Sequence, residues 1–182
     1  MKNNYIHKYL NKYSKVLMNY SSKDFFKIDR IIEEVKKNKK KIIIVGNGGS
    51  AAIANHFALD LTKMTGIKAI SFSDSAMLTA FANDFGYENW VKKSLDFYAD
   101  KGDILILISS SGMSKNILNA VKSKKINFVI TFSGFSEKNR LNRLGNLNFY
   151  VKSNVYNIVE NIHQIWILSL VDCLLKKWKL KF

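Results

Sequence analysis

Ionisable side chains stand at helical spacing at two places in this chain of 182 residues. His56 and Asp60 lie four residues apart in an apolar stretch, so they share one face of a predicted helix. Glu160, His163 and Gln164 form a polar patch in a second such stretch near the C-terminus. Carboxylates and imidazoles can carry protons to and from a substrate or ligate a metal ion. Both sets are therefore candidate acid–base groups. The alternatives are a solvated helix face for the first set and partnered buried polar groups for the second.

A glycine turn at residues 46–50 immediately precedes the helix that carries His56. It follows a short apolar run at residues 41–45, which is typical of a buried parallel strand. Glycine lets backbone N–H groups approach a ligand closely, and a helix start adds unpaired donors and a positive dipole end. The turn therefore predicts a site for an anion or a polar sugar. The residues of this site are Asn47, Gly48, Gly49 and Ser50.

A serine turn at residues 109–114 repeats this arrangement after the apolar run at residues 103–108. Its four hydroxyl groups can donate hydrogen bonds to one phosphate, together with backbone N–H groups. The alternative is that serine and glycine only form a tight turn and cap the next helix. Because two such turns occur in one small chain, we predict a phosphate site here. Its residues are Ser109, Ser110, Ser111 and Ser114.

Neither turn has the pattern of the common nucleotide-binding loops. The chain has no G-x-x-x-x-G-K-[ST] and no G-x-G-x-x-G followed by an acidic residue at the end of the next strand. The predicted ligand is therefore a small phosphorylated molecule other than those nucleotides. Asn83 and Asp84, at the end of a helical run, are further candidates for contact with sugar hydroxyls, or they form a simple helix terminus.

The elements that must position these residues alternate between strands and helices. Five strand candidates are separated mostly by helical stretches, an order that favours a parallel sheet covered on both faces. We expect one α/β domain over residues 1–182, with N-terminal helices over 1–40, a Rossmann-like three-layer core over 41–152 and a final apolar helix over 155–178. The strand candidates are Lys41–Val45, Lys68–Phe72, Asp103–Ile108, Phe128–Phe132 and Asn148–Val151.

Composition narrows the function classes. The net charge is +15, but only Arg30, Arg140 and Arg143 are arginines among the 29 basic residues, and the lysines are spread along the chain. This pattern does not favour a nucleic-acid surface. A single cysteine, Cys173, is consistent with a reducing compartment, and no signal peptide opens the sequence. The longest apolar stretch, Ile162 to Leu175, contains polar residues and is short for a membrane span, so we expect a cytoplasmic protein without membrane contact.

The chain resembles the sugar isomerase (SIS) domain family, and within it the phosphoheptose isomerases. These enzymes interconvert sedoheptulose 7-phosphate and an aldose heptose 7-phosphate for surface-polysaccharide heptose synthesis. The resemblance implies a five-stranded parallel sheet, a homotetramer, sugar contacts from the glycine turn and from Asn83 and Asp84, and phosphate contacts from the serine turn. The motifs that carry the resemblance, between about residues 5 and 178, are residues 46–52, 55–61, 83–86, 102–105 and 109–114.

The acid–base residues depart from the family pattern. The family pairs a glutamate on the first core helix with a histidine on the last helix, and zinc can bind there with a histidine and a glutamine. His56 matches, but Asp60 replaces the glutamate, Glu160 replaces the glutamine and Leu168 replaces the catalytic histidine. Leucine can neither transfer a proton nor ligate zinc.

From these residues we expect an aldose–ketose isomerase that works through an enediol. Asp60 would act as the base and Glu160 or His163 as its partner, and zinc, if bound, would contact His56, Asp60 and Glu160. The alternatives are an isomerase for another phosphosugar, or a non-catalytic SIS module that binds a phosphosugar or a protein.

Overall fold

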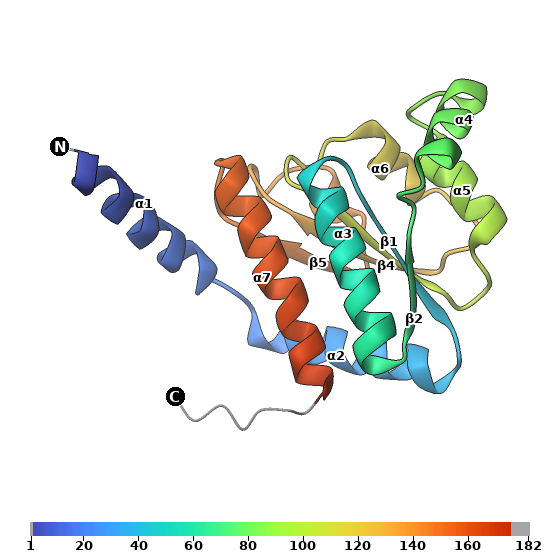
Figure 1. Cartoon of the computed structure of the whole chain (residues 1–182), viewed down its shortest axis with the longest axis horizontal. Helices are drawn as coiled ribbons and strands as arrows, with labels where there is room; N and C mark the ends of the chain where they lie inside the picture. The colour runs from blue at the N-terminus through green and yellow to red at the C-terminus, as the bar shows by residue number, and fades with distance from the viewer. Residues whose placement is uncertain (1, 176–182) are drawn as a thin grey trace.

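Five parallel strands form the centre of the chain in a computed structural model that describes residues 2–175 (Figure 1). Each apolar run predicted to be a strand forms one, with ends shifted by at most one residue. The strands are β1 (Lys41–Gly46), β2 (Lys68–Ser71), β3 (Ile104–Ser109), β4 (Phe128–Ser133) and β5 (Leu147–Tyr150).

The order of the strands, β2-β1-β3-β4-β5, determines where a ligand can bind. From β1 the chain passes to one side to form β2, and then crosses to the other side of β1 to form β3. In an open parallel sheet, such a change of direction leaves a crevice beyond the carboxyl ends of the two strands. The glycine turn follows β1 and the serine turn follows β3, so both turns flank this crevice.

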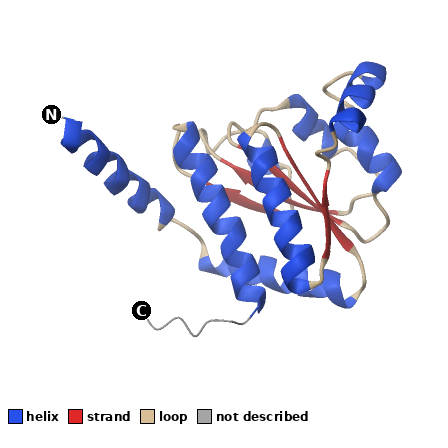
Figure 2. Ribbon diagram, viewed as in Figure 1, coloured by secondary structure: helices blue, strands red, loops and turns tan. Residues whose placement is uncertain are grey.

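Helices cover both faces of the sheet (Figure 2). On one face lie α2 (Ser22–Lys37), α3 (Gly49–Asp60) and α7 (Tyr156–Leu175), and the other face carries α4 (Ser75–Phe85), α5 (Trp90–Tyr98) and α6 (Lys115–Ala120). The N-terminal helices are separated as predicted: α1 covers Lys2–Leu17, and Ser21 caps α2 by accepting a hydrogen bond from the Asp24 N–H. A π-helical turn, η1 (Leu61–Thr65), follows α3, and a 3₁₀ turn, η2 (Leu141–Arg143), precedes β5. The predicted end of the last helix at residue 178 lies outside the described residues.

Alternate residues of the strands supply the two sides of the core. Ile42 and Ile44 of β1 pack with α2, α3 and α7, whereas Ile43 and Val45 pack with α5 and α6. This alternation follows from the two-residue repeat of a strand and explains why the runs are apolar without interruption. The result is the three-layer arrangement that the sequence predicts.

The apolar helix α7 is a core element of this arrangement. Its length and composition would allow it to cross a membrane, but eight of its twenty residues are buried inside the domain, where it packs against α2 and α3. In contrast, α1 extends away from the layers (Figure 1). Tyr5, Ile6 and Leu10 on α1 are each more than half exposed, with 72%, 62% and 56% of their surface accessible.

Candidate active site

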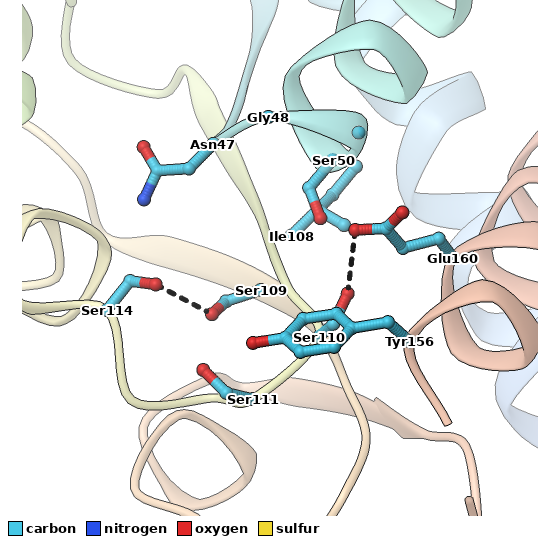
Figure 3. Close-up of a pocket in the computed structure, with 11 residues that line it drawn as sticks. Asn47, Gly48, Ser50, Ile108, Ser109, Ser110, Ser111, Ser114, Tyr156 and Glu160 are labelled. Atoms are coloured by element: carbon cyan, nitrogen blue, oxygen red, sulfur yellow. Dashed lines mark hydrogen bonds between the residues drawn. The ribbon is translucent and has the colours of Figure 1, made fainter. Parts of the chain in front are cut away.

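A pocket of about 250 Å³ lies at the carboxyl edge of the sheet, between the two turns and the start of α7 (Figure 3). All eight residues predicted from the two turns line it, together with three others. The lining residues are Asn47, Gly48, Gly49, Ser50, Ile108, Ser109, Ser110, Ser111, Ser114, Tyr156 and Glu160. The structure therefore brings the predicted residues of both turns together in one site.

Backbone hydrogen bonds hold the serine turn in shape: the Gly112 N–H donates to the Ser109 carbonyl at 2.9 Å, and the Gly112 carbonyl accepts from the Leu141 N–H at 3.1 Å. Gly112 has a φ of +64°, a conformation that L side chains rarely adopt, and a Cβ there would collide with the Asn139 side chain. Asn139 is buried and donates from Nδ2 to the Ser133 hydroxyl at 3.1 Å and to the Ser136 carbonyl at 2.7 Å. Because the turn is held from behind, its hydroxyl groups are available at the pocket surface.

The glycine turn brings the backbone close to a carboxylate. A Cβ on Gly49 would lie 2.5 Å from the Glu160 Oε2, so a side chain at this position would displace the Glu160 carboxylate. Gly49 and Ser50 form the first turn of α3, where backbone N–H groups have no helical partner and the helix dipole is positive. This end of the pocket therefore suits negative charge or a polar oxygen.

Glu160 is the only carboxylate among the described residues that line the pocket. Its Oε1 accepts a hydrogen bond of 3.4 Å from the Ser110 hydroxyl, as Figure 3 shows. Tyr156, one turn earlier on α7, also lines the pocket, and its ring packs edge-on against Phe135 at 4.6 Å between centroids. Tyr156 was not predicted as a site residue from the sequence. The signal was its position at the start of the last helix, which must begin at the same edge of the sheet as both turns.

His56 and Asp60 lie on α3 outside the pocket lining, where they form a pair with each other. The His56 Nε2 is 3.2 Å from the Asp60 Oδ2, and the His56 Nδ1 is 3.5 Å from the Gln164 Nε2. One neutral tautomer satisfies both contacts, since Nε2–H can donate to the carboxylate while Nδ1 accepts from the amide. We call His56, Asp60, Gln164 and the partly buried Leu168 the α3–α7 face.

Comparison with known proteins identifies the family to which this chain belongs. The SIS domain family matches residues 4–130 of the chain. A phosphoheptose isomerase of Helicobacter pylori (strain P12) is 36% identical over 151 residues, or 79% of each sequence. A phosphoheptose isomerase of Buchnera aphidicola subsp. Acyrthosiphon pisum is 39% identical over 133 residues, which is 66% of this chain and 69% of the relative. The chain belongs to the phosphoheptose isomerase family.

Solved structures of phosphoheptose isomerases have the same fold. The structure of GmhA from Neisseria gonorrhoeae superposes with a TM-score of 0.86 at 25% identity and covers 96% of this chain and 98% of its own. The phosphoheptose isomerase of Francisella tularensis superposes with a TM-score of 0.88 at 25% identity, and the match covers 97% of this chain and 100% of that protein's chain. The predicted five-stranded SIS fold is thereby confirmed.

His163 does not reach the pocket of this phosphoheptose isomerase family member. It is fully buried, and its Nε2 lies 3.1 Å from the Ser133 carbonyl, which can only accept, so Nε2 carries the proton. Burial lowers the pKa of His163 to about 4, against a smaller opposing effect of the bond to Ser133. The structure therefore corrects the prediction that His163 partners the catalytic carboxylate, because a neutral imidazole in the core cannot touch a sugar.

The described residues do not form the zinc site that the family pattern implies. Across residues 2–175 no three His, Cys, Asp or Glu side chains gather in a metal-binding arrangement. His56 and Asp60 are paired, but Glu160 lies in the pocket against Ser110, and Leu168 has no donor atom. Two adjacent donors from this chain fall short of the three protein ligands of a catalytic zinc. We therefore assign no step of the chemistry to a metal ion.

Asn83 and Asp84 also lie away from the pocket. They are exposed at the end of α4, where the Asn83 Nδ2 donates to the Asp84 Oδ1 at 3.0 Å. Neither residue is among those that line the cavity. Their predicted contact with the sugar therefore stays a prediction that this single subunit does not support.

Proposed function

We propose that the chain is a phosphosugar isomerase that converts sedoheptulose 7-phosphate into the aldose heptose 7-phosphate. The observation that carries this proposal is the pocket itself, in which a serine turn, a glycine turn and one carboxylate face a single cavity. The names of the relatives supply the substrate, since those that match over most of the chain are phosphoheptose isomerases.

The serine turn would hold the phosphate group. Ser109, Ser111 and Ser114 provide hydroxyl donors along one side of the cavity, and the Ser109 hydroxyl already donates to Ser114 at 3.3 Å (Figure 3). Hydroxyl groups can rotate toward a phosphate without moving the backbone, which suits an anion that arrives and leaves in each cycle. With the phosphate there, the carbon chain would extend toward Gly49 and Glu160.

Glu160 would act as the base of the enediol step. Its carboxylate would take the proton from the carbon next to the carbonyl, the electron pair of that C–H bond would form the C=C bond of the enediol, and the carbonyl oxygen would take a proton from solvent as its π bond breaks. Return of the abstracted proton to the former carbonyl carbon, with loss of the other enediol hydroxyl's proton to solvent as that oxygen becomes the new carbonyl, would complete the interconversion. The hydroxyl of Ser110, bonded to Glu160, and the N–H groups at the start of α3 are placed to polarise sugar oxygens.

The decisive experiment is incubation of the purified protein with sedoheptulose 7-phosphate, with detection of the aldose product. We expect product, a raised melting temperature with substrate, and turnover that changes less than twofold with added zinc or a chelator. No product and no melting shift would overturn the proposal.

A second candidate function is phosphosugar binding without turnover. It is favoured by Leu168, which occupies the position of the family's catalytic histidine, and by the distance of the His56–Asp60 pair from the pocket lining. Binding to the serine turn would persist in such a protein. A melting shift without product would establish this alternative.

The assembly is proposed to be a homo-oligomer, most simply a tetramer, in the cytoplasm. Exposed apolar residues on the projecting helix α1, including Tyr5, Ile6 and Leu10, need a covering surface, and a second copy of the chain supplies one. Size-exclusion chromatography with light scattering should give a mass of several subunits. A monomeric mass would contradict it.

A further inference from the structure

A pair of carboxamides, Asn47 and the buried Asn116, joins the two turns of the pocket. Asn116 belongs to the first turn of α6, directly after the serine turn, and only 1% of it is exposed. Its Nδ2 donates to the Asn47 Oδ1 at 2.8 Å, and the Asn47 Nδ2 donates to its Oδ1 at 2.9 Å. The two side chains thus form a closed ring of two hydrogen bonds across 69 positions of sequence.

A third hydrogen bond completes the surroundings of Asn47. The Tyr87 hydroxyl, from the segment between α4 and α5, donates to the Asn47 Oδ1 at 3.3 Å. A carboxamide oxygen accepts through two lone pairs and its nitrogen donates two hydrogens. Asn116 and Tyr87 occupy both lone pairs, and Asn116 takes one hydrogen, so one N–H of Asn47 is left for a ligand.

We infer that Asn116 is a positioning residue that fixes the Asn47 carboxamide so that it offers a single donor to the sugar. In Figure 3 the Asn47 nitrogen lies on the side of Ser114 and Ser109, and its oxygen lies on the opposite side. The ligand atom opposite Asn47 is then an acceptor oxygen, such as a carbonyl or hydroxyl oxygen of the substrate. This inference rests on the proposed function for its substrate, and on the hydrogen bonds alone for its geometry.

Asn116 does not line the pocket, so it affects substrate binding by orienting Asn47 and not by contact with the substrate. Without it, the Asn47 carboxamide can turn about its terminal bond, and a share of the molecules would present an oxygen where a donor is needed. An acceptor facing a sugar oxygen leaves both without a partner, which weakens substrate binding and turnover.

A double-mutant cycle tests this inference. Asn116→Leu keeps the approximate volume but removes both hydrogen bonds, and we expect kcat/KM for sedoheptulose 7-phosphate to fall about tenfold. In the background of Asn47→Ala, the same change should alter kcat/KM less than twofold, because the group it positions is already absent. An equal loss in both backgrounds would show a general structural role and overturn the inference.

The matched control is Asn119→Ala on the same helix. The Asn119 carboxamide donates to the Glu88 carbonyl at 3.0 Å and to the Asn89 Oδ1 at 3.4 Å, away from the cavity. We expect it to leave kcat/KM within twofold of the original protein. A loss equal to that of Asn116→Leu would show that any change in α6 disturbs the site, and would also overturn the inference.

A measurement without substrate separates this inference from the proposed function. The side-chain ¹⁵N–H signals of Asn47, identified by their loss in Asn47→Ala, should exchange slowly with water, and Asn116→Leu should accelerate that exchange at least tenfold. If the protein does not turn over sedoheptulose 7-phosphate but this acceleration occurs, the proposed function fails and the positioning role stands. Unchanged exchange refutes the positioning role whether or not the enzyme is active.

Discussion

The pocket and the α3–α7 face lie in the same subunit, but they are built differently. Two backbone turns form most of the pocket; Asn116 holds the Asn47 side chain through two hydrogen bonds, and Leu141 holds the serine turn through the Gly112 carbonyl. The α3–α7 face consists of helix side chains such as His56, whose side chain is 47% exposed and contacts Asp60 and Gln164. The turn residues predicted to bind the phosphosugar therefore line one pocket of a single subunit, whereas His56 and Asp60 lie outside that lining.

The largest effect on kcat is expected from a change of Glu160, the carboxylate in the pocket. Glu160→Gln keeps the size of the side chain and removes the proposed base, so kcat should fall about 10³-fold with little change in KM. Initial-rate kinetics with sedoheptulose 7-phosphate measure this. Glu33→Gln, an exposed change on α2, is the control that should leave kcat unchanged. A loss below tenfold in Glu160→Gln would mean that the base lies outside the pocket.

The free energy of unfolding should depend on pH through the buried His163. Because the pKa of His163 is lowered to about 4 by burial, the unfolded chain binds a proton between pH 6.5 and pH 4 that the folded chain does not. The free energy of unfolding should therefore decrease as the pH falls through this window, by about 3 kcal/mol in total, and should change no further through His163 at lower pH. His163→Asn retains an N–H donor for the Ser133 carbonyl and should remove this part of the dependence.

Urea unfolding at pH 7 and pH 5 measures the effect of His163. The control is His7→Asn on the exposed part of α1, which should leave the pH dependence intact. Equal pH dependence in His163→Asn and the original protein would show that other groups cause it.

A smaller effect is expected at the phosphate end of the pocket. Ser111→Ala and Ser114→Ala each remove one hydroxyl donor to a charged group, so KM should rise about tenfold while kcat changes little. Competitive inhibition by inorganic phosphate should weaken by the same factor. Ser14→Ala, at an exposed position on α1, should change neither quantity. An unchanged KM in both pocket variants would place the phosphate elsewhere.

The smallest effect is expected on the α3–α7 face. Asp60→Asn should lower kcat less than tenfold, since Asp60 pairs with His56 and does not line the pocket. Leu168→His should leave kcat within twofold. If Asp60→Asn instead exceeds Glu160→Gln in its effect on kcat, the sugar extends along this face and Asp60 is the base.

The main features of the fold could be predicted from local sequence. Uninterrupted apolar runs such as residues 104–108 indicate strands buried on both faces, and the glycine and serine turns that follow them mark the ligand edge. The predicted helix after the glycine turn also forms, although η1 replaces its continuation beyond Asp60 with a π-helical turn. Periodicity alone does not distinguish these two kinds of turn.

The side of a helix that faces a pocket was harder to predict. Glu160 and His163 are three residues apart and only about 60° apart around α7, yet that rotation takes one side chain into the cavity and the other into the core. Tyr87 and Asn116 were missed because their partner, Asn47, is at least 40 positions away in the sequence. Such a pairing depends on the strand order and leaves no local signal.

The register between β1 and β3 has a consequence for folding. Gly46 pairs with Ile108, so the two turns meet only after segments about 60 residues apart have docked in parallel. Contacts of this sequence separation form slowly, since the chain must close a long loop before any interaction compensates for the lost entropy. The lining of the pocket comes from both turns, so neither turn forms the proposed phosphosugar site alone. A ligand bound to both turns would therefore stabilise only chains in which β1 and β3 are already paired. Its binding during refolding would show when this pairing has formed.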